Sequence, residues 1–401
     1  MKRRPDLAQP IEVFKNEVFV GRLVRTPKGC RFEFDPSITA DGKSMRITYR
    51  ILADRNPYEI VGVNLPAYFA GLLPEGKRLT ALVKSLKTSE DDLFGLLQGA
   101  GTEPVGDLHF SSQGTPGFKK GLEKLTSADF AEIKKEFLRT GQTLNHPVSG
   151  VQNKISGSRL TLPLNLGIKS RTKQYILKFD SAETPDLIEN EFYSLQLAKA
   201  CGFQVNKAAI ITDSKGEKAL LITRFDREWL KERKVFTRFH QEDACQFLDR
   251  YPADKYHLSM QEIAEGIVGL CETPQIEILA LLKLAAFSYL IGNGDLHGKN
   301  ISLIQKEIST LSPVYDIVCT YVYGDQQMAL AMDGKKDNWK RSLFIKFGER
   351  YGVTKVSIEK MLDQLMAKFA KNKDLLWQAP ILATKQKMLE DLFKLRLKHL
   401  S

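Results

Sequence analysis

A long apolar run that ends in a glycine-containing polar loop constrains the fold of this chain more than any other feature. Residues 281–290 are almost wholly apolar, and the run is long enough for a buried helix. Gly292 and Gly294 then break the run within residues 291–300, which read IGNGDLHGKN. The pattern predicts a core helix that stops abruptly and leads into a loop of the kind that carries catalytic residues.

Two short strands are predicted after this loop. Residues 301–304 give one strand signal and residues 311–317 give another. A hairpin formed by these strands would return Asp316 toward Asp295 and Asn300, which lie in the loop. The sequence therefore predicts that these three polar side chains meet at one place.

The three residue types suit phosphoryl transfer from ATP. Asp295 could orient the hydroxyl group of a substrate, while Asn300 and Asp316 could hold Mg²⁺ on ATP through hard oxygen ligands. The competing interpretation is an ordinary polar turn between a helix and a strand, because Asp, Asn and Gly dominate turns for conformational reasons. The motif alone leaves both interpretations open.

A kinase would also need a glycine turn over the phosphates and a lysine on a strand. Gly150, within residues 149–154, lies between two predicted strands, although any hairpin could contain such a glycine. Lys178 lies in an otherwise apolar strand and is costly to bury without an anionic partner, for which a nucleotide phosphate or Glu191 would serve. The alternative for Lys178 is an exposed position on an edge strand.

The composition is that of a folded protein. Hydrophobic residues make up 43% of the 401 residues and charged residues 27%, so the chain is long enough for two or three domains. We expect no membrane span and no signal segment, which makes the cytoplasm the default location. Lys and Arg number 59 against 48 for Asp and Glu, a net charge of +11. This excess suggests an anionic partner such as nucleic acid or a nucleotide, although solvated helix faces also explain many basic residues near the C-terminus.

The cysteines carry no recognisable site. They are odd in number, scattered, and never spaced as Cys-x-x-Cys, which argues against a disulfide framework and a zinc site. We expect buried, reduced thiols at Cys30, Cys201, Cys245, Cys271 and Cys319.

The order of the predicted elements divides the chain into three parts. Strands are expected at residues 11–24, 30–34, 45–51, 105–110, 149–155, 159–162, 174–179, 208–212 and 219–225, and helices at 77–84, 90–97, 130–139 and 188–200. We predict a β-rich accessory subdomain at residues 1–115, a kinase N-lobe at 116–226 and a mainly helical C-lobe at 227–401. Strands with one helix, followed by a helical half, are typical of an α+β, bilobal protein-kinase-like fold.

Over almost its whole length the chain resembles the HipA family of bacterial toxin kinases. The resemblance rests on residues 148–154, 176–179, 189–192, 223–227, 241–243, 290–302 and 315–317, with 72–75 and 104–106 in the N-terminal part. Several segments in the right order make an accidental match implausible, so the resemblance favours the catalytic interpretation of the loop.

The resemblance implies a role for each matching residue. Asp295 would be the catalytic base, Asn300 and Asp316 would bind Mg²⁺, and Lys178 would contact the phosphates of ATP. The ATP-binding residues implied are Ser149, Gly150, Val151, Gln152, Asn153, Lys154, Lys178, Thr223, Arg224, Phe225, His297, Gly298, Lys299, Asn300, Tyr315 and Asp316. Residues 241–243 are suggested only as the side on which the acceptor binds.

The chain departs from the family pattern at two positions. Thr223 stands where the hinge often has Glu, a change of little cost if the hinge contacts adenine through its backbone. Pro147 stands where well-known members carry an autophosphorylated Ser, and proline has no hydroxyl group. Other members carry a Ser directly before the glycine, so we expect autophosphorylation, if any, at Ser149.

The resemblance also implies a function and partners. The expected activity is that of a serine/threonine kinase that uses Mg²⁺ and ATP, phosphorylates a translation-related protein such as an aminoacyl-tRNA synthetase, and inhibits growth. The expected partners are a helix-turn-helix antitoxin and, through the complex, operator DNA. A catalytically silent, DNA-bound co-repressor is the main alternative, and a phosphoinositide-type lipid kinase is another.

Overall fold

The computed structural model describes residues 9–40, 46–62, 65–100, 104–111, 129–134, 160–164, 173–180 and 184–401. The expected glycine turn at residues 149–154, with Ser149, and the position of Pro147 lie outside the described residues. The predicted boundary between residues 115 and 116 also lies outside them, and the division into domains stays a prediction.

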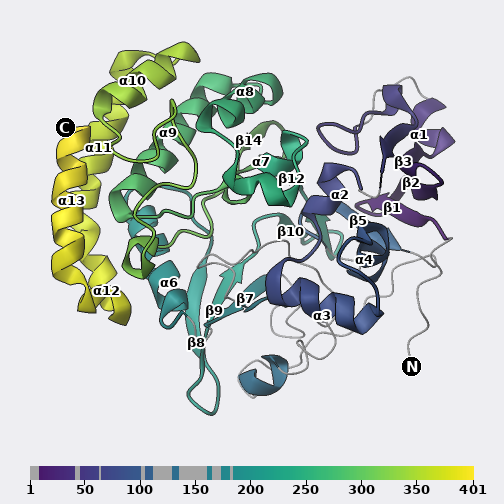
Figure 1. The fold of residues 1–401 in the computed structure, drawn as a ribbon, viewed down its shortest axis with the longest axis horizontal. Helices are drawn as coiled ribbons and strands as arrows, with labels where there is room; N and C mark the ends of the chain where they lie inside the picture. Colours follow the sequence, from purple (N-terminus) through teal and green to yellow (C-terminus); the bar gives the residue numbers. More distant parts are fainter. Residues whose placement is uncertain are drawn as a thin grey trace.

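A five-stranded antiparallel sheet, in the order β4-β3-β2-β1-β5, forms the N-terminal unit (Figure 1). Its strands are β1 (Ile11–Lys15), β2 (Val18–Thr26), β3 (Gly29–Phe34), β4 (Tyr58–Val61) and β5 (Leu108–Ser111). The helices of this unit are α1 (Pro36–Ala40), α2 (Ala67–Gly71), α3 (Gly76–Leu86) and α4 (Leu93–Ala100). Ile11 and Val13 are fully buried, as expected for alternate residues on the core face of a strand.

A second antiparallel sheet, in the order β6-β7-β9-β8, lies in the middle of the chain. Its strands are β6 (Leu160–Leu164), β7 (Tyr175–Phe179), β8 (Ala208–Thr212) and β9 (Lys218–Thr223), and α6 (Leu187–Ala200) packs against it. Ile176 belongs to the cluster on the α6 side, whereas Leu177 and Phe179 pack against Phe130. Because successive residues of a strand face opposite sides, Lys178 shares the α6 side with Ile176.

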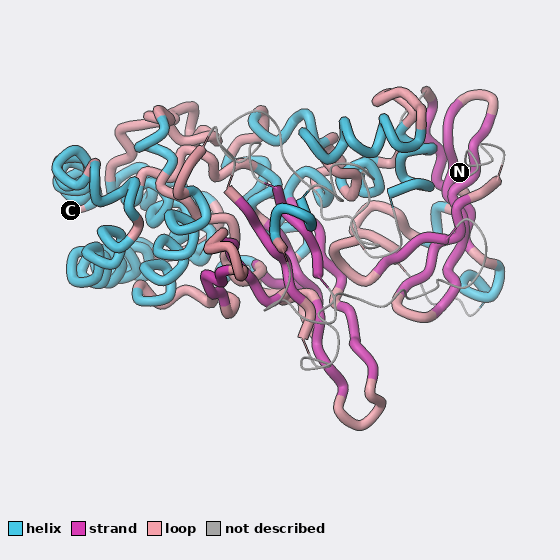
Figure 2. Tube along the Cα trace, turned by 90° about the horizontal axis from the view of Figure 1, so that it is seen from below, coloured by secondary structure: helices cyan, strands magenta, loops and turns pink. Residues whose placement is uncertain are grey.

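The remainder of the chain is mainly helical (Figure 2). Its helices are α7 (Ala244–Phe247), α8 (Met260–Leu270), α9 (Pro274–Ile291), α10 (Arg341–Arg350), α11 (Lys355–Asn372), α12 (Pro380–Thr384) and α13 (Gln386–Leu400), with 3₁₀ turns η4 (Pro252–Tyr256), η5 (Gly298–Asn300), η6 (Thr320–Tyr323) and η7 (Lys373–Gln378). Its strands are β10 (Arg227–Leu230), β11 (Val235–Arg238), β12 (His240–Asp243), β13 (Ser302–Gln305) and β14 (Ser309–Leu311). Helices and antiparallel sheets in separate parts of the chain confirm the predicted α+β class.

Helix α9 forms the centre of the helical half. By length and composition alone it passes for a membrane-spanning helix. The helix is nevertheless part of the largest hydrophobic core, and Leu281, Ala285 and Leu290 are fully buried there. It ends at Gly292, whose φ of 76° is the left-handed conformation that glycine adopts most easily. The predicted break at this glycine is confirmed.

Two predicted strands are absent from the described residues. Residues 47–50 form a bend, because the Thr48 hydroxyl accepts hydrogen bonds from the N–H groups of Arg50 and Ile51 and closes a local turn. The alternation of apolar and polar residues that suggested a strand arises because Ile47 and Ile51 are buried in the hydrophobic core.

The second failed prediction is the strand at residues 311–317. Strand β14 ends at Leu311, since Pro313 has no N–H group to donate and Asp316 has a φ of 54°. A hairpin does form after the loop, between β13 and β14, but its second strand covers Ser309–Leu311 and not the predicted residues 311–317. The five cysteines are all buried and unpaired, which confirms their expected state.

Candidate active site

Lys178 is held between two carboxylates in the interior. Its strand, β7, lies between β6 and β9, so the edge-strand interpretation was wrong. The Lys178 Nζ atom lies 2.8 and 3.0 Å from the two oxygens of Glu191 on α6, and 2.8 Å from Oδ1 of Asp316. Glu191 is fully buried and Lys178 is 9% exposed. Two carboxylates compensate the cost of burying one ammonium group and fix its position.

The loop that carries Asp316 adopts an unusual backbone conformation. The φ of Asp316 is 54°, in the left-handed region. Asp tolerates this region better than most residues because its short side chain can form hydrogen bonds with the nearby backbone. The residue follows the β13–β14 hairpin, and its side chain reaches Lys178 from the helical half. The ion pair therefore joins the two halves of the cleft.

The loop after α9 holds Asp295 from several directions. The side-chain oxygen of Asn293 accepts the Asp295 N–H at 3.1 Å, and Asn300 Nδ2 donates to the Asp295 carbonyl at 2.9 Å. This second bond fixes the amide of Asn300, and its remaining oxygen is the group that could bind a metal ion. The hydroxyl of Tyr256 donates to Asp295 Oδ1 at 2.7 Å. Burial raises the pKa of Tyr256, and the neighbouring Asp295 raises it further, so this hydroxyl stays a donor.

His297 is a buried side chain whose polar atoms have no partner among the described residues. It is 3% exposed, and neither ring nitrogen is hydrogen-bonded within the described part of the chain. Burial lowers its pKa below the ordinary 6.5, so the ring is neutral near pH 7. The ring contacts Tyr256 edge to face at 5.0 Å and lines the cleft. Unsatisfied buried nitrogens facing a cavity fit a site that binds a polar ligand.

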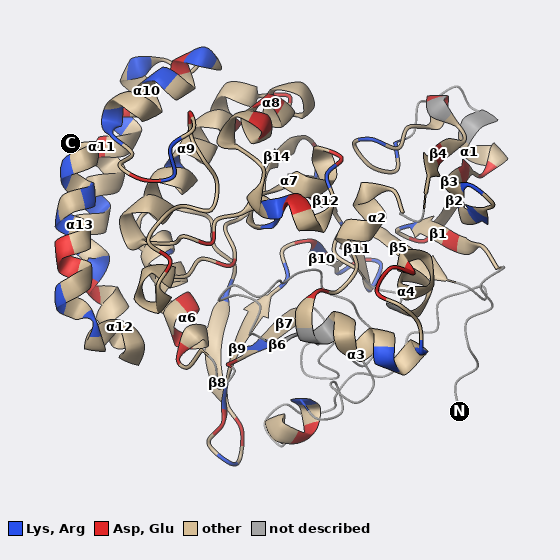
Figure 3. Cartoon of the chain, in the orientation of Figure 1, with Lys and Arg blue, Asp and Glu red and all other residues tan. Residues whose placement is uncertain are grey.

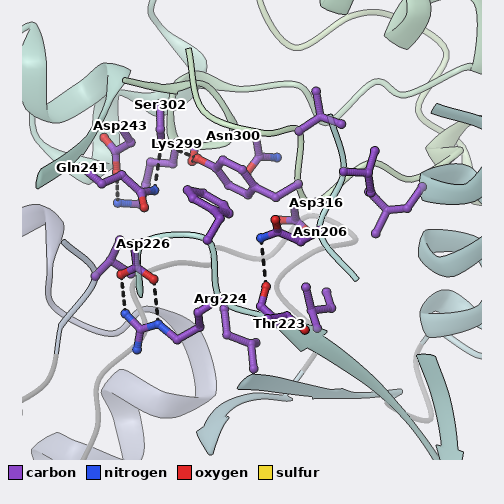
Figure 4. Close-up of a pocket in the computed structure, with 18 of the residues that line it drawn as sticks. Asn206, Thr223, Arg224, Asp226, Gln241, Asp243, Lys299, Asn300, Ser302 and Asp316 are labelled. Carbon is purple, nitrogen blue, oxygen red and sulfur yellow. Dashed lines mark hydrogen bonds and ion pairs between the residues drawn. The ribbon is translucent and has the colours of Figure 1, made fainter. Parts of the chain in front are cut away.

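The cleft lies between the second sheet and the helical half (Figure 4). Apolar side chains from both sides line it, namely Val105, Ile176, Leu195, Val205, Ile222, Phe225 and Val314. Lys178, Asn300 and Asp316 line it as well, so one cavity combines apolar walls with a charged region. Asp295 is not among the lining residues and lies beside the cavity, next to Tyr256.

The predicted hinge lines the same cavity and is held by the protein itself. Asn206 Nδ2 donates to the Thr223 carbonyl at 2.9 Å, and the N–H of Thr223 donates to the Lys207 carbonyl at 2.8 Å. The Arg224 side chain pairs with Asp226 at 2.6 Å. These contacts place the hinge backbone in one conformation.

Two hinge groups could still recognise a planar ring. Within the described residues, the N–H of Phe225 has no hydrogen-bond partner, and the Thr223 carbonyl retains a second lone pair. The ring of Phe225 lies 5.6 Å from that of Tyr315, whose hydroxyl donates to the Lys299 carbonyl at 2.7 Å. Tyr315 therefore supports the wall of the cleft.

Lys299 has a structural environment that the sequence did not suggest. Its Nζ donates to Asp243 at 2.8 Å and to the Gly71 carbonyl at 3.0 Å. Burial opposes its charge, but the carboxylates of Asp243 and Glu75 outweigh burial and raise its pKa. Glu75 also accepts from the fully buried Lys255 at 2.7 Å. The N-terminal unit is thus bound directly to the loop that carries Asp295.

The suggested acceptor side at residues 241–243 is occupied by protein contacts. Glu242 is fully buried, accepts from the Tyr49 N–H at 2.6 Å and contacts His240 Nε2 at 2.8 Å. Asp243 pairs with Lys299 and caps α7. The charges of Glu242 and Asp243 thus have partners inside the protein, although Gln241 and Asp243 line the cleft, and the suggested acceptor side stays a prediction.

Sequence reasoning missed four residues that shape the site: Asn206, Tyr256, Lys255 and Glu75. Each acts through a partner far along the chain, as Lys255 does with Glu75, and no local spacing connects such pairs. A buried Lys in a 3₁₀ turn that also contains an Asp gives no signal of its own.

The donor set of the cleft fits magnesium better than a transition metal. The described residues contain no group of three or more His, Cys, Asp or Glu that could hold a metal ion. An amide oxygen and a carboxylate, together with phosphate oxygens, are the ligands Mg²⁺ takes in phosphoryl-transfer sites. Asn300 and Asp316, which line one cavity, supply these two donors.

Comparison with known proteins identifies relatives of both halves. The model of the HipA-like C-terminal domain matches residues 147–373, and that of the HipA N-terminal domain matches residues 11–111. The putative kinase Y4mE of Sinorhizobium fredii is 28% identical over 285 residues, 66% of each chain. The serine/threonine-protein kinase toxin HipA of Shewanella oneidensis is 28% identical over 302 residues, 67% of each chain. The match thus spans about two thirds of the length of these relatives.

A solved structure matches nearly the whole chain. It is the complex of Shewanella oneidensis HipA, HipB and operator DNA, with a TM-score of 0.72 and 20% identity over 97% of this chain and 96% of that chain. The similarity shows a shared fold and confirms the predicted bilobal, kinase-like architecture.

Proposed function

The chain belongs to the HipA family, and we propose that it is an ATP-dependent serine/threonine protein kinase. The observation that carries the proposal is the buried contact of Lys178 with both Glu191 and Asp316. A fixed ammonium and a carboxylate, beside a cavity with apolar walls, are the parts that hold nucleotide phosphates and a metal ion in kinases.

ATP and Mg²⁺ are the cofactors of this proposal. Bound Mg²⁺-ATP would supply the phosphoryl group to be transferred. Adenine would lie between the apolar walls, where the Phe225 N–H and the Thr223 carbonyl offer a donor and an acceptor to the ring. Lys178 would bind the phosphates, while Asn300 and Asp316 would hold Mg²⁺.

The role proposed for Asp295 is to orient the acceptor hydroxyl and receive its proton. The hydrogen bond from Tyr256 engages Oδ1 and so fixes the rotation of the carboxylate. His297 is neutral near pH 7 and adds no positive charge beside the base. These chain residues would contribute positioning and electrostatics, which dominate catalysis of phosphoryl transfer.

The substrate and partners are proposed from the family. We propose that a translation-related protein, such as an aminoacyl-tRNA synthetase, is phosphorylated in the cytoplasm and that growth is inhibited as a result. The solved relative is a complex with HipB and operator DNA, which supports an antitoxin and operator DNA as partners of this chain. The net charge of +11 is compatible with DNA nearby.

A phosphoproteome comparison tests the proposal in cells. Cells that express this chain should contain new phosphoserine or phosphothreonine in at least one protein and should grow slowly. Cells that express Asp295→Gln should show neither effect, while the variant accumulates to the same level. Equal phosphorylation and toxicity in both strains would refute the assignment of Asp295.

Autophosphorylation at Ser149 remains a separate prediction. Mass spectrometry of the purified protein after incubation with ATP and Mg²⁺ should find phosphate on Ser149. Phosphate at other sites with Ser149 unmodified would contradict the prediction without affecting the proposed kinase activity.

A further inference from the structure

A second cavity lies outside the ATP cleft, between α9 and α11. Its volume is about 370 Å³, within the range of sites for small molecules. Lys283, Lys360 and Lys368 line it, and no Asp or Glu does among the residues that the structure describes. Figure 3 shows basic residues along the neighbouring C-terminal helices as well. The cavity is therefore positively charged.

Two of these lysines converge on a single point. Lys283 Nζ donates to the Gly202 carbonyl at 2.8 Å. A β-carbon placed on Gly202 would lie 3.1 Å from Lys368 Nζ and 3.6 Å from Lys283 Nζ, so both ammonium groups face the same small space. Burial lowers the pKa of Lys283, and the charge of Lys368 lowers it further. Like charges that face one space repel each other, and an anion between them would replace the repulsion by attraction.

Structural roles do not account for all three lysines. The bond from Lys283 satisfies a carbonyl just after the end of α6, where a cation is favoured by the helix dipole. The ammonium groups of Lys360 and Lys368 have no hydrogen-bond or ion-pair partner in the described part of the chain.

The acidic residues of α11 do not neutralise the cavity. Asp363 pairs with Arg341, and Glu359 lies 3.8 Å from Lys355. Within the described residues, the charge of the cavity is therefore left without a counter-ion.

The remaining surface of the cavity is apolar. Leu279, Met361 and Leu365 line it, and Ile276 at its edge is 64% exposed. Apolar surface next to a cluster of cations favours a ligand that has an anionic end and an apolar body. A simple inorganic anion would use only half of the site.

We propose that this cavity binds a small phosphorylated molecule, with its phosphoryl group between Lys283 and Lys368 and its apolar part on Ile276, Leu279 and Met361. The site is separate from the cleft that contains Lys178 and depends on no step of the proposed kinase reaction. Binding at this cavity could therefore be disproved without affecting the proposed kinase activity, and the reverse also holds.

Site-specific lysine labelling of the full chain tests the proposal, with phenyl phosphate as the probe. An amine-reactive reagent followed by mass spectrometry reports each lysine separately, so binding in the ATP cleft does not interfere. Phenyl phosphate should reduce labelling of Lys283 and Lys368 several-fold and leave Lys371, on the same helix, unchanged. Inorganic phosphate should need about tenfold higher concentration, because it cannot use the apolar surface.

The variant Lys368→Gln provides the decisive control, with Lys371→Gln as its match. Without ligand, Lys368→Gln should have an unchanged or higher Tm, since it removes a repulsion, yet phenyl phosphate should no longer protect Lys283. Lys371→Gln should retain that protection. Equal protection of Lys371, full protection of Lys283 in Lys368→Gln, or equal potency of phosphate and phenyl phosphate would each overturn the proposed site.

Discussion

The two ends of the proposed ATP cleft differ in the groups they offer to a ligand. At the hinge end, apolar side chains form the walls, and the available polar groups belong to the backbone of Thr223 and Phe225. At the phosphate end, the Lys178 ammonium group lies 2.8 Å from a carboxylate oxygen of Glu191 and 2.8 Å from one of Asp316. Most substitutions keep the backbone N–H and C=O groups, whereas replacing a charged side chain removes its charge. The side chains of Thr223 and Phe225 can therefore change more freely than those of Lys178, Glu191 and Asp316.

The charges of the phosphate end also depend on each other for folding. Glu191 is fully buried and its carboxylate contacts Lys178 through both oxygens. Removing one member of a buried pair leaves an uncompensated charge in the protein interior. Function and stability are thus linked at Lys178, whereas the Thr223 and Phe225 side chains at the hinge carry no charge whose loss would leave a buried partner unpaired.

The largest effect is expected at Asp295. Asp295→Gln should lower the rate of phosphoryl transfer by about 10³-fold, since it removes the base and its orientation by Tyr256. Initial rates with labelled ATP measure the loss. Asp254→Asn, in the nearby turn η4, should be fully active, and a similar loss in that control would mean that the effect is not specific to Asp295.

Replacing Lys178 should reduce both activity and stability. Lys178→Met should lower phosphoryl transfer about 10²-fold and the free energy of unfolding by about 3 to 5 kcal/mol, because Glu191 loses its partner. Urea denaturation measures the second effect. The double variant Lys178→Met with Glu191→Met should regain the stability lost through the unpaired Glu191 carboxylate but not activity, and Asp316 would still lack its lysine. If stability were not regained, charge compensation would not explain the burial of Lys178.

A smaller loss of activity is expected for Tyr256→Phe. The change removes the hydrogen bond to Asp295 Oδ1, and one such bond to a charged group is worth about tenfold in kcat. The KM for ATP should stay constant, because Tyr256 does not line the cavity. Tyr251→Phe, which loses only a bond to the Leu65 carbonyl, should keep its kcat. A changed KM with constant kcat would contradict the positioning role.

The charge of His240, which does not line the cleft, is compensated by two carboxylates and gives a further test of charge compensation. Its ring lies between Asp107 at 3.0 Å and Glu242 at 2.8 Å. Burial opposes its charge, but Asp107 and then Glu242 outweigh burial and raise its pKa above the ordinary 6.5. The unfolded chain then loses this proton first as the pH rises, so the stabilisation present below pH 6.5 is lost above it.

The corresponding measurement is the free energy of unfolding between pH 6 and 9. The stability of the wild type relative to His240→Gln should fall by up to about 1.4 kcal/mol per pH unit above the ordinary pKa of histidine. A difference that does not depend on pH would show that His240 is not charged in the folded protein.

The smallest effect is expected at the hinge. Thr223→Glu should change the KM for ATP by no more than about twofold, because the proposed contact with adenine uses only the backbone of this residue. Thr223→Val should behave in the same way. A tenfold change in the Glu variant would show that the side chain contributes to nucleotide binding, and the contrast between the two ends would be lost.

The sequence predicted the local parts of this site better than its long-range contacts. The end of α9 at Gly292 and the strand that carries Lys178 follow from apolar runs and glycine, and the cost of burying a charge made Glu191 one of two expected partners of Lys178. The contact of Lys255 with Glu75 could not be predicted, because it depends on how the N-terminal unit packs against the helical half.

Irregular backbone was the other source of error. The alternation in residues 45–51 suggested a strand, but the Thr48 hydroxyl closes a local turn there. The left-handed conformation of Asp316 likewise has no signature in the sequence, although it directs the side chain toward Lys178.

The most direct test of the account is transfer of labelled phosphate by the purified protein. The wild type, incubated with γ-labelled ATP, Mg²⁺ and a cell extract, should place label on serine or threonine of a protein, and Asp295→Gln should place none. Label in lipid, equal labelling by the two proteins, or no labelling by a folded wild type would contradict the central claim that this cleft is a protein kinase site.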